Sequence, residues 1–368
     1  MGLLGLSGCG SPSSASVEMS SQTELVKTGS MELQYAENFA VDYYEDGYKM
    51  LTTLPDSKRY LIVPEAQPVP RGLDEDVSIL QEPLQNIYLV ASGVMDMFAS
   101  VDAVDQIRFS GQKQENWYIQ TAKDAMAAGD MIYAGKYSKP DYELLVSEGC
   151  DLAIENRMIT HSPEVVEMLQ SFDIPVMIEY SSYEQHPLGK VEWVKFFGAL
   201  TGKEAEAEEA FAEQTEILEE VESGEKTGKT IAFFYVTSNG LIQVRQSTDY
   251  IPKLIELAGG RYIFEDLEDS GSGRSTLNMQ VEDFYAGAKD ADILIYNSSI
   301  DGGVTTLDEL IGKCNILKDF KAVQEGQVYC TTNDMYQQSM AIGYLLQDMH
   351  TVLTDDDTAK LRYLFLLQ

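Results

Sequence analysis

Apolar residues follow two different rhythms along the chain, and the change of rhythm separates an N-terminal extension from the rest. In residues 39–63, Tyr, Val and Leu alternate with polar residues, and the pairs Asp46-Gly47 and Pro55-Asp56 interrupt the alternation. A period of two, broken by turn residues, is typical of antiparallel strands joined by tight turns. We therefore predict a β-meander at residues 35–64, with Asp46-Gly47 as a tight turn.

From residue 86 onward, short apolar runs alternate with segments whose apolar residues recur at helical spacing. Strands are predicted at 86–90, 106–109, 132–135, 151–154, 174–178, 230–236, 293–296 and 327–330. Helices are predicted from 93 to 104, from about 140, and at 163–171, 249–257 and 335–353. This alternation predicts α/β architecture, with mostly parallel sheets covered by helices on both faces.

The alternation is interrupted once, by two consecutive helical segments. Residues 187–200 carry apolar residues at helical spacing and end at Thr201-Gly202, and residues 203–223 are rich in Ala, Glu and Leu, which favour helix. We predict a tether at 1–30, an N-terminal α/β lobe at 31–185, an interlobe helix at 186–202 and a C-terminal α/β lobe at 203–368.

The N-terminal residues carry a processing signal. Leu6-Ser7-Gly8-Cys9 resembles the bacterial lipobox, although no Lys or Arg precedes it, and a Ser-rich stretch follows. Such a stretch has little to bury and forms a flexible tether. We predict that Cys9 is the lipid attachment site. The protein would then be anchored to the outer face of the membrane without spanning it, because the chain has no apolar run of about 18 residues.

The charge and the metal-binding residue types narrow the function. The chain has 26 Lys plus Arg against 60 Asp plus Glu, a formal net charge of −34. Such a surface repels phosphate backbones, so nucleic acid is not expected as a partner. The chain has three His and four Cys without a C-x-x-C pair, so no structural metal site is predicted. Pairing of Cys314 with Cys330 stays open.

An extracytoplasmic serine hydrolase of the penicillin-interacting type is a remote alternative. Ser110 and Lys113 match S-x-x-K, and Lys226-Thr227-Gly228 matches K-T-G. The chain contains no S-D-N, and Ser110 follows a predicted strand, whereas the nucleophile should open a helix. We therefore predict that the protein is not an enzyme.

Three stretches together resemble a known class of binding proteins: residues 184–193 with their continuation to 205, residues 140–145, and residues 257–260. The chain resembles substrate-binding proteins of ABC importers of the iron–siderophore, haem and cobalamin type. The resemblance implies two Rossmann-like lobes joined by a single long α-helix, with the ligand in the cleft between them. The β-meander looks like an N-terminal extension found in Gram-positive members.

The resemblance also implies a ligand and partners. The ligand would be a metal chelate, either an iron–siderophore or haem, with cobalamin or another corrinoid as the alternative, and no resident cofactor is expected. The partners would be the permease subunits of the importer, docked by one glutamate on each lobe of a monomer. Glu143 and Glu282, each in the first turn of a predicted helix, fall at the matching positions.

Ligands of doubly wound sheets lie beyond the carboxyl ends of the strands, and this rule selects loops. Aromatic rings there suit a large, partly apolar chelate, and arginines suit its acidic groups. The candidate ligand residues are Trp117, Tyr137, Glu155, Asn156, Arg157, Tyr180, Tyr183, Tyr235, Arg245, Asn297 and Tyr336. A haem ligand would need an axial residue, for which His161 and Tyr137 are candidates, whereas His186 is expected to be structural.

Overall fold

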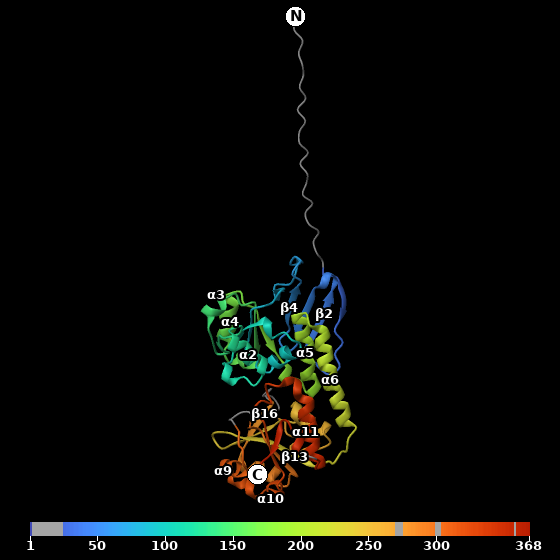
Figure 1. Cartoon of the computed structure of the whole chain (residues 1–368), viewed down its shortest axis with the longest axis vertical. Helices are drawn as coiled ribbons and strands as arrows, with labels where there is room; N and C mark the ends of the chain where they lie inside the picture. Colours follow the sequence, from blue (N-terminus) through green and yellow to red (C-terminus); the bar gives the residue numbers. More distant parts are fainter. Residues whose placement is uncertain (2–24, 269–274, 299–302, 357) are drawn as a thin grey trace.

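Two α/β lobes lie one above the other along the long axis of the molecule, and a separate sheet lies beside the first lobe (Figure 1). The structure is a computed structural model of the chain that describes residues 1, 25–268, 275–298, 303–356 and 358–368. Cys9, the predicted lipid attachment site, lies outside the described residues.

The separate sheet contains the predicted β-meander. Its five strands, in spatial order, are β1 (Lys27–Ser30), β2 (Phe39–Tyr44), β3 (Lys49–Thr53), β4 (Lys58–Val63) and β5 (Val77–Gln81). Strands β2 to β4 confirm the meander, and the turn between β2 and β3 holds Asp46 at φ 59° and Gly47 at φ 85°. The sheet is larger than predicted because β1 pairs antiparallel with β2, and β5 pairs parallel with β4.

The first lobe is built on an entirely parallel sheet in the order β12-β11-β6-β7-β8. These strands are β6 (Ile87–Leu89), β7 (Ile107–Ser110), β8 (Ile132–Tyr133), β11 (Leu152–Asn156) and β12 (Val176–Glu179), and a short hairpin is formed by β9 (Gly135–Lys136) and β10 (Lys139–Pro140). Its helices are α1 (Val94–Ser100), α2 (Gln120–Ala128), α3 (Tyr142–Ser147) and α4 (Pro163–Ser171). Pro140, predicted to open a helix, lies instead in β10, and the Asp141 carboxylate caps α3.

The second lobe has a mixed sheet in the order β16-β14-β13-β17-β18-β19, with β15 also paired to β13. Its strands are β13 (Thr230–Val236), β14 (Ile242–Arg245), β15 (Arg261–Tyr262), β16 (Thr276–Met279), β17 (Ile293–Tyr296), β18 (Val328–Thr331) and β19 (Leu364–Leu366). The central strands β13, β17 and β18 are parallel as predicted, whereas β14, β16 and β19 add antiparallel edges that the pattern did not reveal.

The helices of the second lobe are α7 (Tyr250–Leu257), α8 (Val281–Ala288), α9 (Leu307–Lys313), α10 (Lys321–Glu325) and α11 (Ile342–Thr354). Helix α11 is shorter than the helix predicted at 335–353. Residues 334–341 form turns and a 3-10 segment that reach toward the first lobe instead.

Two helices connect the lobes, α5 (Pro187–Thr201) and α6 (Glu204–Glu222), and they run along each other beside the lobes (Figure 1). The sequence pattern placed the second of these helices in the second lobe. The helices approach closely at their shared end, where a Cβ on Gly198 would lie 2.6 Å from the Cβ of Ala207. Every residue from Pro187 to Leu200 is buried, so α5 is covered on all sides although it carries Lys190, Glu192 and Lys195.

Two buried glutamates fasten the N-terminal extension to α5. The Glu192 carboxylate accepts hydrogen bonds of 2.8 to 2.9 Å from the backbone N–H groups of residues 34–36. The Glu184 carboxylate accepts from the backbone N–H groups of Glu37 and Asn38, and from the Trp193 indole at 2.9 Å. These contacts give the stretch 184–193 a structural role.

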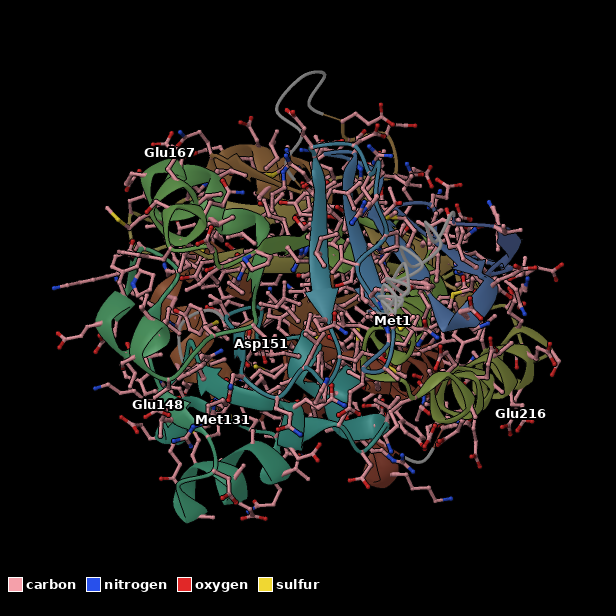
Figure 2. All side chains as sticks on the ribbon, turned by 90° about the horizontal axis from the view of Figure 1, so that it is seen from above. Met1, Met131, Glu148, Asp151, Glu167 and Glu216 are labelled. Atoms are coloured by element: carbon pink, nitrogen blue, oxygen red, sulfur yellow. The ribbon has the colours of Figure 1, made fainter. Side chains whose placement is uncertain are left out.

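The acidic surplus lies on the outside of the molecule. Seen from above, side chains tipped with oxygen fringe the surface, with Glu216 of α6 on one side and Glu148 and Glu167 of the first lobe on the other (Figure 2). In the part of the chain that the structure describes, no helix is long and apolar enough to cross a membrane.

Candidate functional site

The first lobe, helix α5 and the second lobe together line a cavity of about 260 Å³. The first lobe contributes the segments that follow β6, β11 and β12, which are the carboxyl ends of parallel strands, as the strand-end rule predicts. Helix α5 contributes Lys190. The lining residues are Ala91, Ser92, Gly93, Asn156, Arg157, Met158, Glu179, Ser182, Tyr183, Lys190, Arg245, Asp249, Tyr250, Ser275 and Tyr336.

A buried arginine organises the second-lobe wall of the cavity. Arg245, at the end of β14, lies 3.3 Å from an Asp249 carboxylate oxygen and donates a hydrogen bond to the Tyr336 hydroxyl. Asn297 donates to the same hydroxyl at 2.7 Å, so it supports the wall from behind. Asp249 caps α7 by accepting from the Ile251 N–H at 2.9 Å. These bonds fix Arg245 and Tyr336 in place.

The first-lobe wall combines a carboxylate with a cation stacked on a ring. Glu179, at the end of β12, accepts hydrogen bonds from the N–H and the hydroxyl of Ser181 at 2.8 and 2.6 Å. Burial raises the pKa of Glu179, against these hydrogen bonds, which lower it. The Arg157 guanidinium lies 4.6 Å from the ring centre of Tyr183, a cation–π contact at the mouth of the cavity.

Direct contacts between the lobes close one side of the cleft. The Gln337 side chain donates to the carbonyl of Asn116 at 2.8 Å and accepts from the N–H of Tyr118 at 2.8 Å. Asp96 of α1 accepts from the N–H of Met340 at 2.8 Å. Burial raises the pKa of Asp96 to about 6. The segment that carries Tyr336 is therefore joined both to the cavity wall and to the opposite lobe.

Five predicted ligand residues line the cavity, namely Asn156, Arg157, Tyr183, Arg245 and Tyr336. Asn297 lies behind them. The other five predicted ligand residues do not line the cavity, namely Trp117, Tyr137, Glu155, Tyr180 and Tyr235.

The four aromatic residues in this last group serve as packing. Trp117 is 1% exposed and donates to the Ser110 hydroxyl at 3.1 Å, inside the first lobe. Tyr137 packs against the core under α3, and Tyr235 packs in the second lobe, 6.2 Å from the ring of Tyr296. Tyr180 is buried and meets Tyr183 edge-on, which places it behind the cavity wall.

Glu155 points away from the cavity. It follows the alternation of β11 onto the face that carries Ala153, where its neighbours belong to the apolar core that includes Tyr88 and Leu145. Its side chain is 0% exposed, and neither carboxylate oxygen has a hydrogen-bond partner among the described residues. Burial raises its pKa to about 8.

Three charged residues of the cavity were not among the ligand residues predicted from the sequence, namely Glu179, Lys190 and Asp249. Lys190 is one of three charged residues in the buried and mostly apolar helix α5, and Glu179 ends a buried strand. A charge inside an apolar run is expensive to bury, and this signal could have identified both residues.

The remaining sequence candidates have structural surroundings. His161 is exposed at the end of a 3-10 segment, and neither it nor Tyr137 lines the cavity, so neither is placed as an axial ligand. His186 caps α5 through its Nδ1 and stacks on Tyr35 at 4.4 Å, which fits the expected structural role. Cys314 and Cys330 are thiols in the second-lobe core, and no disulfide joins them.

The hydrolase alternative lacks the required geometry. Ser110 is buried, its hydroxyl donates to the Gln112 carbonyl at 2.7 Å and accepts from the Trp117 indole, and the K-T-G motif lies in the loop before β13 of the other lobe. In the described ranges, no group of three or more His, Cys, Asp or Glu side chains could hold a metal ion.

The two candidate docking glutamates are both exposed. Glu143 lies in the first turn of α3, and Glu282 lies in the first turn of α8, so each lobe presents one of them to solvent.

Comparison with known proteins agrees with this architecture, since a family model described as periplasmic binding protein matches residues 90–335, more than half of the chain. The chain belongs to the periplasmic binding protein family. Since this family consists of solute-binding proteins, membership confirms that the chain is not an enzyme.

Relatives and solved structures extend the comparison. This periplasmic binding protein is 24% identical to an uncharacterised lipoprotein of Methanocaldococcus jannaschii, over 87% of this chain and 81% of the relative. Its fold is similar to a periplasmic haem-binding protein of Vibrio cholerae, with a TM-score of 0.57 and 14% identity over 73% of this chain and 98% of the other. It is equally similar, at 0.57 and 17% identity, to an ABC-type Fe3+-hydroxamate transport protein of Saccharomonospora viridis, over 73% and 93%.

Proposed function

We propose that this periplasmic binding protein captures a metal chelate, an iron–siderophore or haem, in the cleft and delivers it to an ABC importer. The observation that carries the proposal is the cavity between the lobes, lined from both sides by arginine, tyrosine and carboxylate side chains. The solved structures with this fold include proteins named for haem and for Fe3+-hydroxamate, which supports a chelate as the ligand class.

The size of the cavity bears on how a chelate would bind. Pockets for drug-sized ligands measure roughly 300–1,000 Å³, and this cavity is about 260 Å³. It therefore accommodates one edge of a bulky chelate, and binding of the whole molecule requires the lobes to separate. The hydrogen bonds of Gln337 and Asp96 across the cleft would break in that movement.

Titration calorimetry of the soluble body tests the ligand class. A ferric hydroxamate, a ferric catecholate, haemin and cyanocobalamin are compared in parallel at neutral pH. Saturable binding of an iron chelate or haemin in the micromolar range or tighter is expected. Binding of cyanocobalamin alone would move the assignment to the corrinoid alternative, and absence of binding by all four would overturn the metal-chelate proposal.

Delivery would depend on docking to the permease. The proposal assigns this role to Glu143 and Glu282, which are exposed on different lobes. The double variant Glu143→Arg with Glu282→Arg should keep chelate binding and lose uptake in vesicles that contain the importer. A matched control, Glu216→Arg with Glu220→Arg on α6, makes the same charge change on exposed positions. Equal uptake by both variants would argue against the docking role.

The proposed location is the outer face of the membrane, with a lipid on Cys9. The name of the archaeal relative, a lipoprotein, supports this location. Cys9→Ser should move the protein from the membrane fraction to the soluble fraction of cells. Retention of the variant in the membrane fraction would speak against the anchor.

A further inference from the structure

Lys190 is the buried cation at the point where α5 meets the cavity. Its side chain is 4% exposed, yet it is among the residues that line the cavity. The ammonium lies 4.8 Å from the ring centre of Tyr250 in a cation–π contact. Lys190 therefore presents a positive charge to the space between the lobes from a helix that belongs to neither sheet.

The carboxylates around Lys190 are already engaged elsewhere. Glu179 accepts two hydrogen bonds from Ser181, and Asp249 is held by Arg245 and by the N–H of Ile251. Asp96 accepts from Met340. Among the described residues, no carboxylate oxygen lies within the 4.0 Å of an ion pair with the Lys190 ammonium.

Lys195, one and a half turns further along α5, shows how the same helix satisfies a buried lysine. Its side chain is also 4% exposed and also lies over an aromatic ring, that of Phe211 at 4.5 Å. In contrast to Lys190, it pairs with the Glu208 carboxylate at 2.8 Å and does not line the cavity. Lys195 therefore has a carboxylate within ion-pair distance, whereas Lys190, at the cavity, has none among the described residues.

An ammonium without an ionic partner is costly to bury. Burial lowers the pKa of Lys190, against Glu179, Tyr336 and Asp249, which raise it. An anionic group that enters the cavity would supply the missing partner, and Arg245 and Arg157 also line this cavity. Three cations face two carboxylates in the lining, although acidic residues far outnumber basic ones in the whole chain.

We propose that Lys190 is the anion-binding residue of the cleft, and that the ligand carries an ionised oxygen group of the carboxylate type that pairs with it. This inference rests on the proposed function and narrows it. Chelates with an anionic edge, such as citrate or catecholate complexes and haem with its propionates, satisfy the requirement. A corrinoid with a periphery of neutral amides satisfies it poorly.

The test compares Lys190→Met with the matched control Lys195→Met, using ferric citrate, metal-free citrate and cyanocobalamin as probes in titration calorimetry. Ferric citrate should bind the wild type and the control alike, and bind Lys190→Met about 30-fold more weakly or worse, because truncating one member of a buried charge pair is strongly unfavourable. Lys190→Arg should recover part of the affinity. Lys190→Gln provides the same comparison if the Met variant does not fold.

The outcomes separate this inference from the proposed function. Equal binding of ferric citrate to Lys190→Met and Lys195→Met would overturn the anion site and leave the chelate function standing. Lys190-independent binding of cyanocobalamin in preference to ferric citrate would also overturn the anion site, and it would move the ligand to the corrinoid alternative. If no chelate binds but metal-free citrate binds in a manner that depends on Lys190, the chelate function fails and the anion site stands. If citrate binding is absent as well, the anion site is overturned.

Discussion

The buried carboxyl of Glu155 makes the stability of this protein depend on pH in a way that one substitution should remove. Its side chain is 0% exposed, and neither oxygen has a hydrogen-bond partner among the described residues. The nearby hydroxyl of Tyr88 is already committed to the Gly135 carbonyl at 2.8 Å. Glu155→Gln keeps the shape of the side chain and removes its ability to ionise.

The sign and size of the effect follow from the two ionisation states. Burial raises the pKa of Glu155 in the folded chain from 4.5 to about 8. Below pH 4.5 the carboxyl is neutral whether or not the chain is folded, so it contributes nothing. Between these values only the unfolded chain ionises, which lowers the free energy of unfolding by about 1.4 kcal/mol per pH unit. The loss is about 3 kcal/mol at pH 7 and levels off above pH 8.

Urea unfolding of wild type and Glu155→Gln between pH 5 and 9 measures this effect. The difference in the free energy of unfolding should grow in favour of the variant up to about pH 8 and then stay constant. Only its dependence on pH matters, because the fit of the amide adds a constant offset. Glu143→Gln, at an exposed position on the same lobe, is measured in parallel as the matched control. A flat difference for Glu155→Gln would mean that the carboxyl is ionised and paired, and the reasoning would be wrong.

Three further substitutions test contacts that hold the architecture together. Glu192→Ala leaves three backbone N–H groups without an acceptor and should lower the free energy of unfolding by about 3 kcal/mol or more. Glu216→Ala, at an exposed position of α6, should cost less than about 1 kcal/mol, and similar losses for the two variants in urea unfolding would contradict the anchoring role. Gly198→Val places a side chain where a Cβ lies 2.6 Å from Ala207 and should lower the melting temperature; an unchanged melting temperature would show that the helices can separate at no cost. Gln337→Ala removes the two hydrogen bonds that this side chain makes across the cleft and should increase the radius of gyration measured by small-angle X-ray scattering, and an unchanged radius would refute a latch at this point.

Elements with strong local signals were predictable from the sequence. Helix α4 begins at Pro163 and ends at Ser171, as predicted, because proline opens it and its apolar residues keep helical spacing. Strand β13 is a long apolar run and also matches its prediction. Strands β14, β16 and β19 were missed because they are short, and their partners, rather than their own sequences, make them strands.

The sequence identified residues of the site mainly where their position relative to the end of a strand was enough to place them in the cavity. Asn156, Arg157 and Tyr336 lie at or beyond the carboxyl ends of the parallel strands β11 and β18, so the strand-end rule placed them in the cavity. Arg245 was expected in a loop, but it ends the antiparallel strand β14, which the pattern did not reveal, so the rule does not account for its place in the cavity. Glu155 failed because β11 extends to Asn156, and a shift of one residue along a strand turns the side chain to the opposite face. Lys190 was not predicted as a site residue because the apolar spacing of α5 is typical of a core helix. The cavity beside it forms where the two lobes pack together.

The way in which the extension is fastened determines how the protein responds to mechanical load. A force applied to the chain at Lys27 acts first on the exposed edge strand β1. The backbone hydrogen bonds that join β1 to the antiparallel strand β2 can then break one after another. The next point of resistance is the segment at residues 34–36, clamped by the Glu192 carboxylate inside the protein. Strand β1 is therefore expected to detach from the sheet before the force reaches helix α5, which carries Glu192.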